Sequence, residues 1–348
     1  MTNAAAVKTK KSAILDYIRT LPQKKQTLIG VQVNEFEVYM GCNSADRLAA
    51  LTGKRPAIMG LELMNAIAVP FYAGYVVDRA LTQSAAGGLV TLTWHERNPV
   101  EVCIRGEFYD CTKKPMTDET FSAMLTKGTP ENKLWLADVD AMAKVLQTLR
   151  DRGIVVLFRP YHEMSGGWFW WGKKKAFPQL CDALYDELAV RKKLDNLIWV
   201  WSSDRDTPDA QRYVPLRHKP DIVGIDVYEN DRASPKFALG RANLAAAFGD
   251  ATPFAVTELG RIPNREVIDE INPAWVLLWG GEYLDSTLVM NEACKDCNTP
   301  EMVSEFFNYD RTLTLDELPA SLRTVISAGV VNKHPLHLGK PYCPVTLH

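Results

Sequence analysis

The chain has 348 residues, of which 47% are hydrophobic and 24% are charged, and its formal net charge is −2. These proportions are typical of a globular protein with a substantial core, and they exclude an intrinsically disordered chain. Because basic and acidic residues are interspersed, nothing indicates a nucleic-acid or anionic membrane partner, and we expect an uncharged one. No apolar run reaches the roughly 18 residues that would indicate a transmembrane helix.

The N-terminus and the cysteines bear on location. The first eleven residues lack the apolar core of a signal peptide, so the protein is either cytoplasmic, or secreted or periplasmic with its leader removed. Of seven cysteines, Cys103 and Cys111 lie in one polar loop, and Cys294 and Cys297 form a C-x-x-C. Two short-range disulfides would suit a secreted protein, but free thiols fit equally well. Without a second ligand pair for zinc or a phosphate-binding motif, we predict no metal and no cofactor.

Apolar, β-branched runs alternate along the chain with segments of helical period, which is the pattern of repeated β-α units. We predict eight strands, at residues 27–33, 57–63, 89–94, 154–161, 197–202, 222–228, 254–258 and 274–279. Amphipathic segments between them predict helices at residues 70–83, 135–150, 177–191 and 236–248. A last helix at residues 319–327, with proline in its first turn, would close the barrel.

Eight such units without a linker predict one domain over residues 1–348, of the α/β class, with the architecture of a (β/α)8 TIM barrel. A doubly wound sheet would instead have a glycine-rich phosphate loop after the first strand, and residues 30–34 do not form one. Residues 96–132 make a long polar excursion after the third strand. In a barrel such an excursion lies at the C-terminal ends of the strands, where active sites are found.

The most specific local signal is residues 159–172, RPYHEMSGGWFWWG, which directly follow an apolar run. Because side chains alternate along a strand, Arg159, Tyr161 and Glu163 would share one face, and His162 would point the other way unless the strand bends at its end. The nearby tryptophans would offer a stacking surface to a sugar ring. They would also desolvate Glu163 and raise its pKa, as a general acid requires. Alternatively, the tryptophans pack in the core and Glu163 is an ordinary loop carboxylate.

A second carboxylate, Glu258, ends the predicted seventh strand in FAVTELG, residues 254–260. Strands four and seven lie on opposite sides of a barrel mouth, so Glu163 and Glu258 can face each other across it. A pair of carboxyls about 5–5.5 Å apart hydrolyses glycosides with retention of configuration, and a pair about 6.5–9.5 Å apart with inversion. Considered alone, Glu258 could be an ordinary carboxylate at the end of a strand, without a catalytic role.

Together these segments resemble glycoside hydrolase family 26, which belongs to the clan with its acid/base after strand four and its nucleophile after strand seven. The resemblance extends from about residue 30 to residue 279 and rests on five segments, WHERNP (94–99), residues 159–172, GIDVY (224–228), TELG (257–260) and residues 275–279. The central one is specific, because a His-Glu pair followed by W-F-W-W is improbable by chance.

The resemblance implies that Glu163 is the acid/base and Glu258 the nucleophile of a double displacement. It also implies a set of substrate-binding residues, namely Trp94, His95, Asn98, Arg159, His162, Trp168, Asp226, Tyr228 and Trp279. Within this set, Arg159 would keep the nucleophile ionised, Trp168 would stack on a sugar, and Tyr228 would hydrogen-bond Glu258 or the ring oxygen. Asp226 would support Tyr228 from strand six, and Trp279 would form the floor of the subsite for the reacting sugar.

Members of this family mostly hydrolyse β-1,4-mannan, so we expect a monomeric, retaining endo-β-1,4-mannanase that acts on a polysaccharide or oligosaccharide. A β-1,3-xylanase or a mixed-linkage β-glucanase would use the same chemistry. A carbohydrate-binding barrel without activity is an alternative of another class, which the presence of both carboxylates disfavours. Individual residues also have structural alternatives, since His95, His162 and Tyr228 could be packing residues and Arg159 could form a structural ion pair.

Overall fold

The computed structural model describes residues 3–35, 37, 43–284 and 297–322. Eight parallel strands close into a barrel, because β1 (Thr27–Gln32) pairs with both β2 (Ile58–Glu62) and β8 (Trp275–Leu278). Between β2 and β8 the order follows the chain through β3 (Leu89–Trp94), β4 (Val156–Pro160), β5 (Leu197–Asp204), β6 (Ile222–Val227) and β7 (Phe254–Leu259). The predicted (β/α)8 barrel and its eight strands are confirmed. A short strand, β9 (Thr312–Leu313), pairs with the start of β1.

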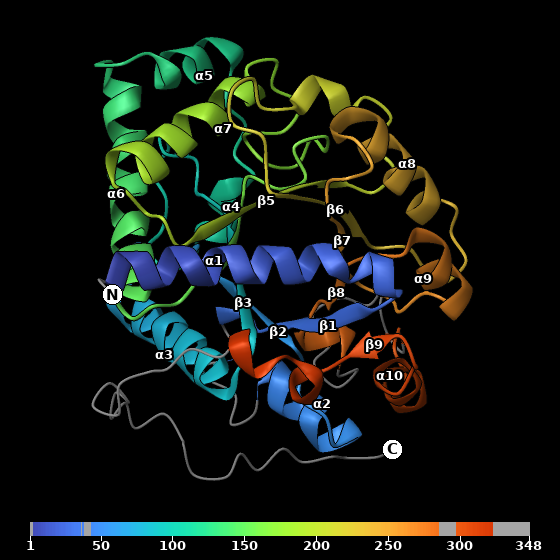
Figure 1. The fold of residues 1–348 in the computed structure, drawn as a ribbon. Coiled ribbons are helices and arrows are strands. Elements are labelled where there is room, and N and C mark those ends of the chain that lie inside the picture. The colour runs from blue at the N-terminus through green and yellow to red at the C-terminus, as the bar shows by residue number, and fades with distance from the viewer. Residues whose placement is uncertain (1–2, 36, 38–42, 285–296, 323–348) are drawn as a thin grey trace.

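Helices surround the barrel (Figure 1). The four predicted from sequence are confirmed as α3 (Pro70–Ala86), α6 (Pro130–Asp151), α7 (Phe177–Tyr185), which continues as a π-helical segment (Asp186–Arg191), and α8 (Lys236–Phe248). Six helices were not predicted: α1 (Asn3–Thr20), α2 (Ser44–Thr52), α4 (Phe108–Thr112), α5 (Asp118–Leu125), α9 (Arg265–Ile271) and α10 (Pro300–Phe307). Most of these are short, so their periodicity is weak. None of the described helices is long and apolar enough to cross a membrane.

Short 3₁₀ helices complete the connections, at Pro22–Lys24, Ala210–Tyr213, Gly281–Tyr283, Leu315–Glu317 and Ala320–Leu322. The last of these lies inside the predicted closing helix at residues 319–327. Residues 323–327 lie outside the described part of the chain, and within it only a single 3₁₀ turn forms there.

The N-terminal end of the barrel is covered by α1, which crosses it in Figure 1. Its apolar residues Ile14 and Ile18 join one buried cluster with the inward-facing residues Leu28, Ile58 and Leu157 at the beginnings of the strands. Farther along, the inward positions become small or polar, as in the succession from Leu157 to Arg159 on β4. The apolar half of the interior therefore supports the fold, and the polar half opens toward the C-terminal ends of the strands.

The contribution of α1 to stability can be measured. Ile18 has no exposed surface, so Ile18→Ala should lower the free energy of unfolding by about 2–5 kcal/mol through lost apolar burial and a residual cavity. Urea denaturation would measure this loss. Leu239→Ala, at a half-exposed position of α8, is a matched control that should change stability by less than about 0.5 kcal/mol. Equal values for the two variants would contradict a core role for α1.

Candidate active site

The polar end of the barrel interior is organised around Arg159 of β4, which is almost completely buried. Its Nη1 donates to Asp226 Oδ2 at 2.8 Å and to Ser202 Oγ at 3.0 Å. Its Nη2 donates to Thr93 Oγ1 at 3.1 Å and to Glu258 Oε1. One guanidinium thus contacts side chains of β3, β5, β6 and β7, and the expected contact with the Glu258 carboxylate is present. A buried positive charge requires such compensation, because desolvation strongly penalises an unpaired ion.

Glu258 is held on both carboxylate oxygens. Oε1 accepts from Arg159, and Oε2 accepts from the hydroxyl of Tyr228 at 2.5 Å. The Nε2 atom of His162 lies 3.6 Å from Oε1. These contacts come from β4 and from the residues that follow β4 and β6, so the carboxylate has one fixed orientation at the barrel mouth.

A register shift between β6 and β7 explains how two consecutive residues both reach this network. Ile225 pairs with Val256, but Asp226 pairs with Glu258, so Thr257 is the extra residue of a bulge. The hydroxyl of Thr257 donates to Asp226 Oδ1 at 2.6 Å, while Glu258 meets Arg159. Without the bulge, strand alternation would direct Thr257 and Glu258 to opposite faces of the barrel wall.

Glu163 follows β4 and is buried beside an indole. The Nε1 of Trp168 donates to Glu163 Oε2 at 2.7 Å, and the backbone N–H of Glu163 donates to the carbonyl of Ser202 at 2.9 Å. Burial raises the pKa of Glu163 well above its usual range, and the negative charges of Asp226 and Glu258 raise it further. The direction expected from the aromatic surroundings is therefore confirmed.

The predicted alternation of side chains fails after Pro160, where β4 ends. Tyr161 and Glu163 have φ angles of 51° and 54°, in the left-handed region that non-glycine residues seldom adopt. The chain bends there, so Tyr161 turns away from Arg159 into the outer wall of the barrel, and His162 turns toward Glu258. The bend that the sequence left open is present, and the shared face predicted for Arg159 and Tyr161 is wrong.

Tyr161 is anchored in that outer wall. Its hydroxyl donates to Glu96 Oε2 at 2.5 Å and accepts from the Nε1 of Trp135 at 2.9 Å. Burial raises the pKa of Glu96 well above its usual range, and the charge of Asp138 adds to this effect. The Oε1 of Glu96 is buried without a hydrogen-bond partner among the described residues, which also suits an uncharged acid. These bonds offset part of the strain in the left-handed segment.

The three tryptophans of residues 168–171 have two different functions in the structure. Trp168 is 38% exposed, whereas Trp170 and Trp171 are buried. The Nε1 of Trp170 donates to the carbonyl of Glu96 at 2.9 Å, and that of Trp171 donates to the carbonyl of His162 at 2.8 Å. The stacking surface expected from all three rings is therefore limited to Trp168, and the other two hold the backbone on either side of the site.

A pair of histidines borders the carboxylates. The Nδ1 of His95 lies 2.6 Å from Glu62 Oε2, and its backbone N–H donates to Glu62 Oε1 at 3.0 Å. The ring of His95 meets that of His162 edge to face, with centroids 4.2 Å apart. Burial lowers the pKa of His162 well below its usual range, and the positive charge of Arg159 acts in the same direction. The lowered pKa favours the neutral imidazole of His162 beside Glu258.

Two predicted substrate-binding residues are not at the mouth. Trp94 shares the outward face of β3 with Leu92, has no exposed surface, and packs against Tyr161 with centroids 5.5 Å apart. Asn98 is also completely buried, where its Nδ2 donates to the carbonyl of Lys114 at 3.0 Å. The prediction that these two line a sugar subsite is corrected, because neither presents surface to a ligand.

Trp279 lies just beyond β8 and is partly buried, and its backbone N–H donates to the carbonyl of Leu259 at 2.8 Å. Two residues of the site were not predicted. Glu62 ends β2 as Glu163 follows β4, and the same signal, a carboxylate closing an apolar run, could have found it. Tyr283, whose ring centroid is 5.4 Å from that of Tyr228, lies in a segment without a sequence signal. Trp275 is buried in the barrel interior, as a core residue.

One group of side chains has the composition of a metal site. Ligand atoms of His162, Asp226 and Glu258 lie within 4.8 Å of one another, and no other described group of three meets that condition. Arg159 already donates to both carboxylates of this group. A cation bound there would face the guanidinium at close range, so these residues do not fit a metal ion.

Elsewhere, Cys103 and Cys111 form a disulfide, which resolves one of the two pairings left open by the sequence. Cys297 is also disulfide-bonded, but Cys294 of the C-x-x-C lies outside the described residues.

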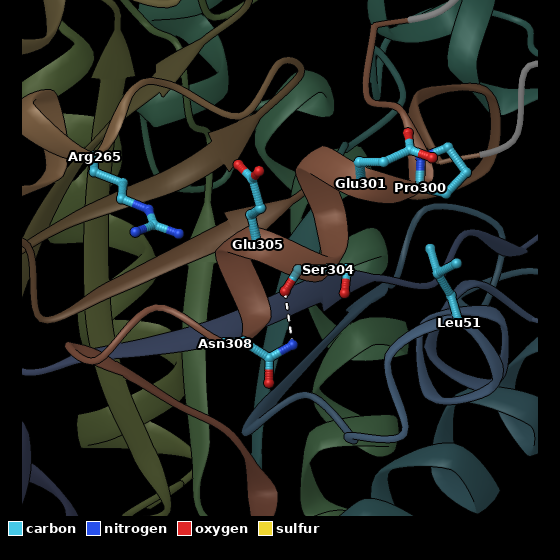
Figure 2. Close-up of a pocket in the computed structure, with 7 residues that line it drawn as sticks. All are labelled: Leu51, Arg265, Pro300, Glu301, Ser304, Glu305 and Asn308. Carbon is cyan, nitrogen blue, oxygen red and sulfur yellow. Dashed lines mark hydrogen bonds between the residues drawn. The ribbon is translucent and has the colours of Figure 1, made fainter.

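A surface pocket of about 520 Å³ lies between α2, α9 and α10, lined by the residues labelled in Figure 2. None of the site residues lines it, and its lining includes no aromatic ring on which a sugar could stack.

Comparisons with known proteins agree with this geometry. The family profile described as Glycosyl hydrolase family 26 matches residues 2–312. A mannan endo-1,4-beta-mannosidase of Thermothelomyces thermophilus is 31% identical over an alignment of 322 residues, and the match covers 88% of this chain and 61% of that protein. A mannan endo-1,4-beta-mannosidase of Bacillus subtilis strain 168 is 32% identical over an alignment of 231 residues, and the match covers 62% of this chain and 60% of that protein. The chain thus spans about three fifths of the length of these two relatives.

Solved structures give the same result. GH26A from Muricauda sp. MAR_2010_75 superposes with a TM-score of 0.76 at 28% identity, covering 89% of this chain and 97% of that one. A beta-mannanase from a symbiotic protist of the termite Reticulitermes speratus, complexed with gluco-manno-oligosaccharide, has a TM-score of 0.73 at 25% identity, covering 87% and 92%.

The anchoring of Tyr161 leads to a prediction about stability. Tyr161→Phe removes the hydroxyl and leaves both the Trp135 N–H and the Glu96 carboxyl buried without this partner, so the free energy of unfolding should fall by about 1–3 kcal/mol. Glu96→Gln keeps an acceptor for the hydroxyl and should lose less than about 1 kcal/mol, provided that Glu96 is uncharged. Chemical denaturation of both variants measures the difference. A larger loss for the glutamine variant would count against a neutral Glu96.

Proposed function

Because the chain belongs to glycosyl hydrolase family 26, we propose that it is an endo-acting hydrolase of β-1,4-mannan that works by double displacement with retention of configuration. The observation that carries this proposal is the contrast between two glutamates at one barrel mouth. Glu258 is ion-paired with a guanidinium and accepts a hydrogen bond from a tyrosine hydroxyl. Glu163 is buried beside an indole, and its pKa is raised. Carboxyls with opposed environments can divide the roles of nucleophile and acid.

In the first step, Glu163 would give its proton to the leaving glycosidic oxygen while Glu258 attacks the anomeric carbon, forming a glycosyl-enzyme. In the second step, the Glu163 carboxylate would remove a proton from water, which displaces Glu258. Arg159 stabilises the Glu258 anion before attack, and the Tyr228 hydroxyl fixes its direction. His162 lies beside Glu258, and its lowered pKa favours the neutral ring. It is therefore suited to hydrogen-bond a sugar hydroxyl without competing with Arg159 for the negative charge of Glu258.

The choice of substrate is supported by the relatives named mannan endo-1,4-beta-mannosidase and by the neighbour complexed with gluco-manno-oligosaccharide. Trp168 supplies an exposed ring at the acid/base for stacking on a sugar. A β-1,3-xylanase or a mixed-linkage β-glucanase would need the same carboxylates. Reducing-sugar release from mannan, β-1,3-xylan and mixed-linkage β-glucan distinguishes them, and absence of turnover on all three would instead favour a carbohydrate-binding barrel.

We also propose that the protein works in an oxidising compartment, outside the cytoplasm. The Cys103–Cys111 disulfide and the disulfide-bonded Cys297 support this, because structural disulfides persist in secreted and periplasmic proteins and are rare in the reducing cytoplasm. Among the described residues, Cys181 is a free thiol and is partly buried.

The roles of the two glutamates predict different responses to substitution. Glu258→Ala should reduce turnover of every substrate by more than about a thousandfold, because no covalent intermediate can form, while the fold is retained. Glu163→Ala should abolish hydrolysis of mannan but largely spare kcat/KM for aryl mannosides, whose good leaving groups need no proton. The kcat for aryl mannosides should still fall, because the base that activates water in the second step is also lost. Steady-state kinetics on both substrate types measures this. If Glu163→Ala lost activity on the two types equally, the acid role would be wrong.

The raised pKa of Glu163 predicts a pH dependence. Only protonated Glu163 can act as the acid, so kcat/KM should fall as pH rises through its pKa. Asp204 at the end of β5 adds a negative charge that raises this pKa, beside the larger effects of burial, Asp226 and Glu258. Asp204→Asn should therefore move the alkaline limb of the profile to lower pH, by less than about one unit. Asp140→Asn, on the exposed surface of α6, is the control and should leave the limb in place.

A further inference from the structure

We infer that Tyr109, together with the disulfide-closed loop that carries it, binds a sugar unit of the substrate beyond the one that reacts. Tyr109 belongs to α4, in the connection between β3 and α6. This inference rests on the proposed function, because it extends the same binding surface to a longer chain.

The position of Tyr109 relative to the carboxylates carries the argument. Starting from Glu258, the next group outward is His162, whose Nε2 lies 3.6 Å away. The ring of His95 meets His162 with centroids 4.2 Å apart, and the ring of Tyr109 meets His95 edge to face with centroids 6.0 Å apart. Tyr109 therefore follows His95 in a succession of contacts that begins at Glu258. A sugar bonded to the reacting unit would reach Tyr109 if the substrate chain ran toward β3.

Exposure separates Tyr109 from the two histidines. Tyr109 is 47% exposed, whereas His95 and His162 are buried. The same loop exposes two aliphatic side chains, Val102 at 91% and Ile104 at 68%, so it presents more apolar surface than a polar surface loop requires. A tyrosine ring offers an apolar face with a polar tip, which suits the C–H face and hydroxyls of a sugar.

The loop is held in place before any ligand binds. The Cys103–Cys111 disulfide closes it immediately beyond Tyr109. The guanidinium of Arg105 donates twice to the carbonyl of Ala68, at 2.6 and 3.0 Å, and ties the loop to the neighbouring β2–α3 connection. On the buried side, the Nδ2 of Asn98 donates to the carbonyl of Lys114. Such preorganisation reduces the entropy lost when an exposed ring binds a ligand.

Lys113 modifies the ring surface. Its Nζ lies 3.9 Å from the centroid of Tyr109, over one face of the ring. A cation there is attracted by the ring and fixes its orientation. The sugar would contact the remaining exposed part of the ring, with the ammonium available to its hydroxyl oxygens.

The test compares substrates of increasing length. Tyr109→Ala should raise KM by about tenfold for mannan and for long β-1,4-linked mannooligosaccharides. The shortest oligosaccharide that is cleaved, which does not reach Tyr109, should keep its KM, and kcat should stay unchanged throughout. Tyr109→Phe retains the ring, so its KM for long substrates should rise much less than that of Tyr109→Ala. Leu239→Ala, which removes an exposed apolar side chain from α8, is the control for a general surface effect.

A second variant tests the loop by another route. The double substitution Cys103→Ser and Cys111→Ser should reproduce the length-dependent rise in KM, because the ring is no longer held. Loss of activity that is equal for short and long substrates would overturn the inference, since it would mean that Tyr109 acts only through His95. An unchanged KM at every length would overturn it too. If the unsubstituted protein failed to cleave mannan at all, the proposed function itself would fall, which separates the two failures.

Discussion

The site depends on one buried cation and the carboxylates that compensate it. Arg159 brings a positive charge into the polar end of the barrel, where it is tolerable only because Asp226 and Glu258 lie beside it. Its other hydrogen bonds reach Ser202 and Thr93, so the same group ties together strands that are distant in sequence. The charge therefore serves the fold and the chemistry at once, since the interaction that stabilises the Glu258 anion also fixes its position.

Both glutamates reach the mouth through departures from regular strand geometry. A bulge between β6 and β7 lets Thr257 and Glu258 join one network, and left-handed residues after β4 turn His162 and Glu163 inward. Left-handed conformations are unfavourable for such side chains, so the surroundings must hold them. The Tyr161 hydroxyl in the outer wall and the indoles of residues 170 and 171 do so through buried hydrogen bonds.

The aromatic residues around the mouth fall into two groups that differ in exposure. Buried rings, such as Trp170 and Trp171, position the backbone and fill the wall. Exposed rings, Trp168 beside Glu163 and Tyr109 on the disulfide-closed loop, offer surface to a ligand. A polysaccharide that bound across this mouth would therefore meet rigid rings at separate points. Its contacts would be preorganised by packing beneath them.

The barrel could be predicted from the sequence, because apolar runs of strand length alternate along the chain with amphipathic segments of helical period. The same pattern located Glu163 and Glu258, since each follows an apolar run at the end of a barrel strand, where active-site residues are found. Strand parity could have shown that Trp94 shares the outward face of β3 with Leu92. The directions of Tyr161 and His162, the burial of Asn98 and the exposure of Tyr109 could not be predicted in this way, because they result from tertiary packing. These features depend on where a strand bends or shifts its register and on which distant residues pack there. Neither kind of feature produces a periodic pattern in the local sequence.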